Sequence, residues 1–143
     1  RPDIHADYPH IDPGRDNDVW NAARRRVRLH AARNEFVAFQ VIVEADRPVE
    51  GIEVRFDSLV GPGGATIGGR HVALLKAWYV HVPRKSTGYS KTSLGRGWYP
   101  DPLIPTPAGE PLKLDIPDPR NGIGAKQRNQ TVWVDLFVQA SER

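Results

Sequence analysis

The chain has 143 residues, which suits one domain with its own hydrophobic core and leaves little room for a second. Hydrophobic residues make up 39% and charged residues 26% of the sequence, a balance typical of globular proteins and too apolar for general disorder. With no run near the roughly 18 apolar residues that span a bilayer, no cysteine for disulfide or thiolate chemistry, and a net charge of +3 without a nucleic-acid recognition motif, we expect no membrane and no nucleic-acid partner.

The first residues are polar and punctuated by proline, and we predict an irregular segment over 1–23 ahead of a β-domain over 24–143. The chain begins at Arg1 and has no methionine, so we expect a processed or excised piece of a larger protein. Apolar and basic residues alternate from Arg26 to Ala31, which is the period of a half-buried strand. We therefore interpret the arginines here as a solvated strand face, with their stems on the sheet and their guanidinium groups in water. They are Arg24, Arg25, Arg26, Arg28 and Arg33.

Three longer runs alternate in the same way and are rich in β-branched and aromatic residues, as strands prefer: 36–45, 51–59 and 71–82. In the third run, Lys76 interrupts one apolar face while the opposite face is also apolar. We therefore expect both faces of this strand to be partly covered.

After Pro83 the periodicity is lost, and it returns only in a short strand around 112–116 and in a clean strand over 131–139. The last strand has Val132, Val134, Leu136 and Val138 on one face. Trp133 and Phe137 lie on the opposite face, which indicates a second covering layer or a partner. Because short strands are joined by turns rich in glycine and proline, with no helical periodicity, the sequence predicts an all-β fold. We expect an antiparallel β-sandwich of jelly-roll or immunoglobulin-like type with a long irregular loop.

Three of these stretches together resemble a known family. They are Ala32–Val41 (ARNEFVAFQV), Gly97–Pro105 (GWYPDPLIP) and Asn129–Asp135 (NQTVWVD). In order and spacing they resemble the N-terminal β-sandwich domain of glycoside hydrolase family 123 and its relatives, over about residues 24–140.

The resemblance implies a non-catalytic accessory domain that scaffolds a downstream catalytic barrel, in an extracellular or periplasmic glycoside hydrolase. The family's domain continues past this last strand into one more strand, which the sequence lacks. We therefore expect an open sheet edge, covered by the catalytic domain or by another copy of the chain. A free-standing carbohydrate-binding module and a small sandwich enzyme are the alternatives.

The stretch from Arg84 to Glu110 is the predicted long loop, and long loops in compact domains are often functional. It carries aromatic rings on which a sugar could stack and a carboxylate that could accept hydroxyl hydrogen bonds. The tentative glycan-contacting residues are Tyr89, Trp98, Tyr99 and Asp101. In the alternative interpretation, Trp98 and Tyr99 fold back to close one end of the sandwich.

We predict no metal and no other cofactor, although two oxygen-rich clusters resemble calcium loops in composition. These clusters are Asp12, Asp16, Asn17 and Asp18, and then Asp115, Asp118 and Asn121. Both also suit plain turns. No catalytic motif occurs, and the carboxylates that a glycosidase would need, such as Asp101 with Glu110 or Asp115, cannot be paired from sequence.

Overall fold

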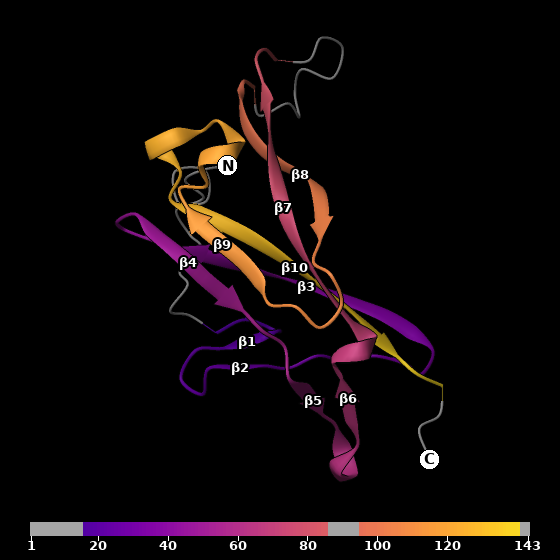
Figure 1. Cartoon of the computed structure of the whole chain (residues 1–143). Coiled ribbons are helices and arrows are strands. Elements are labelled where there is room, and N and C mark those ends of the chain that lie inside the picture. The colour runs from indigo at the N-terminus through magenta and orange to yellow at the C-terminus, as the bar shows by residue number, and fades with distance from the viewer. Residues whose placement is uncertain (1–15, 86–94, 141–143) are drawn as a thin grey trace.

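A computed structural model describes residues 16–85 and 95–140 of the chain. Within these ranges the protein is built from strands and single turns of 3-10 helix (Figure 1). The elements are β1 (Trp20–Asn21), β2 (Arg26–Val27), β3 (Glu35–Glu44), β4 (Val49–Val54), β5 (Ser58–Val60), η1 (Pro62–Gly64), β6 (Thr66–Gly68), η2 (Gly69–His71), β7 (Val72–Val82), β8 (Gly97–Pro105), β9 (Leu112–Ile116), η3 (Pro119–Asn121), η4 (Gly124–Lys126) and β10 (Asn129–Val138).

The largest sheet has four antiparallel strands in the order β3-β10-β7-β8. Strands β3, β7 and β10 coincide with three of the predicted runs, which confirms them. The last described strand, β10, lies in the middle of this sheet, so among residues 16–85 and 95–140 its outermost strands are β3 and β8.

A second layer packs on one face of this sheet and completes the core. Strands β4 and β9 pair antiparallel and lie side by side over β3 and β10 (Figure 1). Leu112 and Leu114 of β9 pack against Val132 and Val134 of β10, and all four are almost fully buried. Since apolar side chains alternate on β9 and β10, each strand buries one side of its pleat in this core. The predicted all-β, sandwich-like fold is confirmed.

The predicted long loop is wrong in its second half, because residues 97–105 form β8 and pair with β7. The sequence does not predict this strand, because Pro100, Pro102 and Pro105 break the alternation of apolar and polar residues and donate no backbone hydrogen bond. Such residues are tolerated on the outermost strand of a sheet, and β8 is an outermost strand. A register shift between Ala77 and Tyr79 accommodates the irregular pairing.

The predicted strand from Arg26 to Ala31 is also wrong beyond its second residue. Only Arg26 and Val27 pair, with Trp20 and Asn21 of β1, so part of the segment assigned as irregular is a short hairpin. The arginines therefore lie exposed on the hairpin turn and the segment after it, rather than along one strand face. Charged side chains held this way are hydrated and contribute little to stability.

Strand β7 extends past β10. Its ladder with β10 covers Val72 to Lys76, whereas its ladder with β8 continues to Val82. Strands β7 and β8 therefore project together beyond the rest of the sheet, as Figure 1 shows. Among the described residues, no helix is long and apolar enough to cross a membrane.

Candidate functional site

A buried polar network fills the junction where β7 separates from β10. Past Lys76 the backbone ladder between the two strands ends, and side chains take its place. The amide Nε2 of Gln130 donates to the carbonyl of Ala77 over 2.6 Å, and the hydroxyl of Tyr79 donates to Oδ1 of Asn129 over 2.6 Å. Because an unpaired backbone carbonyl in the interior is costly, these bonds stabilise the divergence of the strands.

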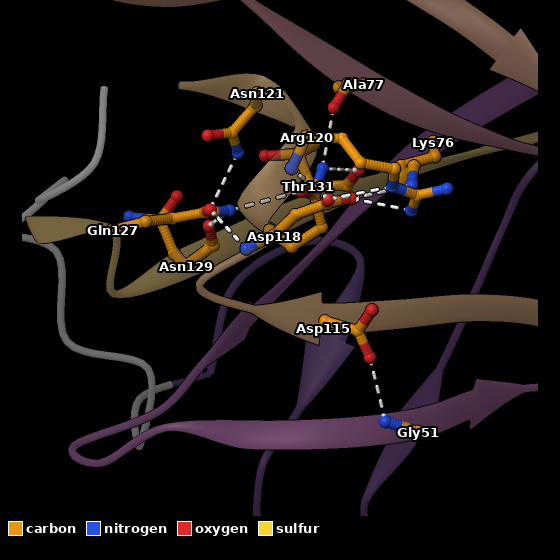
Figure 2. A network of polar contacts seen from close by, with 11 residues as sticks. Gly51, Lys76, Ala77, Asp115, Asp118, Arg120, Asn121, Gln127, Asn129 and Thr131 are labelled. Atoms are coloured by element: carbon orange, nitrogen blue, oxygen red, sulfur yellow. Dashed lines mark hydrogen bonds and ion pairs between the residues drawn. The ribbon is translucent and has the colours of Figure 1, made fainter. Parts of the chain in front are cut away.

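Asp118 is the charged centre of this network (Figure 2). Its Oδ2 lies 3.0 Å from Nζ of Lys76 and 2.8 Å from Nη2 of Arg120. Burial alone raises the pKa of the Asp118 carboxyl, but hydrogen bonds from Arg120 and Lys76 outweigh burial and hold that pKa well below its usual range. The same contact raises the pKa of Arg120. Lys76, which interrupts an apolar face in the sequence, thus has a specific buried partner.

The neutral members of the network are fully hydrogen-bonded. Oε1 of Gln127 accepts from the Asp118 backbone and from Asn121, both over 2.7 Å, and its Nε2 donates to the carbonyl of Asn129 over 2.9 Å and to Gln130 over 3.2 Å. Gln127 is completely buried, so these bonds use its whole donor and acceptor capacity. These bonds fix the loop between β9 and β10 and leave the Gln127 amide engaged within the protein.

Tyr79 belongs to the same junction and is almost fully buried. Burial raises the pKa of the Tyr79 phenol to about 12, because the phenolate would lose its hydration. Its buried ring is structural, in keeping with the expectation that both faces of this strand are partly covered.

The outer face of the four-stranded sheet, opposite the core, carries apolar side chains together with the polar Gln40 and Asp135. One row across the four strands consists of Gln40, Trp133, Leu75 and Pro105, in the order β3-β10-β7-β8. Trp133 and Leu75 are half-buried in it, and the indole Nε1 of Trp133 donates to Oδ1 of Asp135 over 3.0 Å.

The rows on either side add exposed apolar groups. Phe36 is 71% exposed, and its ring lies 4.7 Å from that of Phe137 between centroids. Ile42 and Leu103 are 38% and 39% exposed. Because contiguous exposed apolar side chains on a sheet mark interaction surfaces, this outer face is the candidate binding surface. The alternation on β10 predicts that Trp133 and Phe137 face a partner, whereas Phe36 is found only from the structure, although it alternates in step with Ala38 and Gln40 on β3.

Three of the four candidate glycan residues, Trp98, Tyr99 and Asp101, lie on β8. The ring of Trp98 packs on His81 with centroids 4.8 Å apart, and it is half-buried. Tyr99 donates its hydroxyl to the carbonyl of Gly95 over 2.8 Å. As consecutive strand residues paired with His81 and Val80, Trp98 and Tyr99 point to opposite faces of the sheet. Asp101 is exposed, and Tyr89 lies outside the described residues.

Asp12 lies outside the described residues, but several members of the two oxygen-rich clusters form hydrogen bonds within the chain. Asp16 accepts from Asn21 and from the backbone of Ala22, and Asn17 accepts from two backbone amides of its own turn. Asp115 accepts from the backbone of Gly51, as Figure 2 shows, while Asp118 is engaged with two cations. Within 16–85 and 95–140, no three acidic or histidine side chains gather as they would around a metal ion.

Comparison with known proteins gives no family: no protein-family model matches the chain, and no curated protein sequence matches it.

Proposed function

We propose that the chain is a non-catalytic accessory β-sandwich domain of a multidomain glycoside hydrolase, and that its outer face packs against the neighbouring catalytic domain. The observation that carries the proposal is the outer face itself, where Phe36, Ile42 and Leu103 are exposed around half-buried Trp133. Burying apolar area contributes about 25 cal/mol per Å², so a face of this kind favours association.

Two further observations support the proposal. The three stretches that resemble the family's sandwich domain contribute β3, β8 and β10, all strands of the one sheet that carries the outer face. The buried carboxylate of Asp118 is neutralised by Lys76 and Arg120, which suits a structural group rather than an acid–base catalyst.

The test uses a longer form of the protein that includes the segment following this chain. Leu103→Asp places a charge on the outer face, and we expect it to lower the melting temperature of the longer form by more than it lowers that of the isolated chain, where Leu103 is 39% exposed. Val60→Asp is the matched control, because Val60 is 74% exposed on the β5–β6 hairpin. Equal melting temperatures of wild type and Leu103→Asp in the longer form would contradict the proposal.

A free-standing carbohydrate-binding module is the second candidate, since Trp98 is only half-buried and Asp101 is exposed on the same strand. It predicts that the isolated chain binds an oligosaccharide on a glycan array. Trp98→Ala and Asp101→Asn would each weaken that binding at least about tenfold, which corresponds to the loss of about 1.4 kcal/mol. A blank array would remove this candidate.

A further inference from the structure

The two edges of the four-stranded sheet differ in their ability to pair. Strand β8 carries three prolines, which lack the N–H that a pairing strand needs. Strand β3 is ten residues long, contains no proline or glycine, and has charged residues only at its ends, Glu35 and Glu44. Long flat edges without such protection are templates for another strand.

The register between β3 and β10 shows which groups β3 offers at its edge. The backbone N–H of Ala45 donates to the carbonyl of Arg128, its direct counterpart in the register, so residues of this parity bond β10. Residues of the other parity point their N–H and C=O groups away from β10, because the two directions alternate along an antiparallel strand. On β3 these include Phe36, Ala38, Gln40 and Ile42.

We propose that the chain forms a symmetric dimer in which β3 pairs antiparallel with β3 of a second copy, giving one continuous sheet across both molecules. The pairing must keep core-facing residues opposite core-facing residues. Centred on Phe39, it places Phe36 opposite Ile42 of the other copy and Ala38 opposite Gln40. Each of these pairs exchanges two backbone hydrogen bonds.

Side chains and charges are compatible with this register. On the core-facing side, Val37 lies opposite Val41 of the other copy, which would cover a residue that is 37% exposed in the single chain. Glu35 lies opposite Val43, so no carboxylate meets a carboxylate. Glu44 lies opposite Asn34 of the other copy, so the second carboxylate of β3 also meets a neutral residue.

The second copy is the occupant that the sheet itself favours. A two-fold pairing of β3 is closed, because the same strand is used by both molecules. The outermost strands of the combined sheet are then both β8, whose prolines prevent further addition. Assembly therefore stops at two chains.

Sedimentation of the full 143-residue chain at micromolar concentrations tests the proposal, and we expect a mass of twice 16.0 kDa. Ala38→Pro removes one edge-directed N–H without removing a bond to β10, and we expect a monomer. Ala108→Pro is the matched control. Ala108 occupies the second position of the turn closed by the Glu110 N–H and the Pro107 carbonyl, with Gly109 at φ 82, a turn that accepts proline.

Gln40→Lys keeps the backbone intact and covers the case in which Ala38→Pro does not fold. It brings a lysine from each copy to the centre of the pair, and we expect the dissociation constant to rise at least about tenfold. Amide exchange locates the interface: the amides of Phe36, Ala38, Gln40 and Ile42 should become protected as concentration rises. A monomeric wild type, or a dimer in which these four amides exchange freely, would overturn the proposal.

Discussion

The ammonium nitrogen of Lys76 lies 3.0 Å from Oδ2 of Asp118, and this ion pair ties the four-stranded sheet to the loop that follows β9. Both side chains are withdrawn from water, at 11% and 2% exposure. An ion pair in this setting depends on both partners, since either charge left alone would be buried without compensation.

Removing the carboxylate should therefore cost more than removing the ammonium. We expect Asp118→Asn to lower the free energy of unfolding by about 3 kcal/mol, because it leaves Lys76 buried beside a neutral group. Lys76→Met should cost less, since Arg120 still binds the carboxylate. Urea unfolding measures both variants. Glu53→Gln, which breaks the exposed pair with Arg55, should change stability by less than about 1 kcal/mol. Equal losses in the free energy of unfolding in all three variants would show that the buried ion pair stabilises the fold no more than the exposed one.

Acid should unfold the protein partly through Asp118. The pKa of the Asp118 carboxyl is lower in the folded state than in the unfolded state. The ionised carboxylate therefore adds to the free energy of unfolding above the unfolded pKa of about 4, and this contribution is lost as the pH falls toward the folded pKa. We expect the urea midpoint to fall steeply below about pH 4. In Asp118→Asn this acid dependence should be shallower. The same steep decline in both proteins would assign the acid sensitivity to other carboxyl groups.

Alkali should act through Tyr79 in the opposite sense. Folding raises the pKa of the Tyr79 phenol to about 12. The neutral phenol therefore makes its full contribution to the free energy of unfolding below the unfolded pKa of about 10, and this contribution is lost as the pH rises toward 12. We expect a late step in the tyrosinate absorbance that is absent from Tyr79→Phe. Tyr79→Phe should also lower stability at neutral pH by about 1 kcal/mol, since Asn129 loses a hydrogen bond. Identical titrations of the two proteins would contradict the assignment.

Trp98 should limit what can replace Gly122. A β-carbon on Gly122 would stand 3.3 Å from the indole of Trp98, and the residue has φ 81. Gly109 has nearly the same angle, φ 82, but nothing within 4 Å of such a carbon. We expect Gly109→Ala to cost about 1 kcal/mol from the backbone alone, and Gly122→Ala to cost measurably more. Urea unfolding compares them, and equal losses would mean that the indole moves aside freely.

The sequence predicts the strands whose two faces differ. Leu112, Leu114 and Ile116 alternate with polar residues, and the structure buries all three. It does not predict β8, because proline is compatible with a strand only at a sheet edge, and edge position depends on the whole topology. The extent of the strand begun at Arg26 was overestimated for a related reason, since alternation alone does not supply a pairing partner.

The buried polar network could not be predicted from the local sequence pattern. Lys76 is conspicuous in the sequence because it interrupts an apolar face. Its partner Asp118 lies 42 residues away, among residues that are typical of an ordinary turn. Gln127 and Gln130 carry no sequence signal for burial, because their role arises only where β7 and β10 separate. Tertiary geometry, not periodicity, selects them.

The separation of β7 from β10 also gives the two halves of β7 different support. From Val72 to Lys76 the strand pairs with β10, and at Leu75 and Lys76 it pairs with β8 as well, so we expect this half to open only on global unfolding. Tyr79 stands near the boundary, where its hydroxyl bonds Asn129 of β10. Beyond it, Val80 to Val82 pair with β8 and not with β10 within the described residues, so we expect this end of the strand to open by a sub-global fluctuation while the core stays folded.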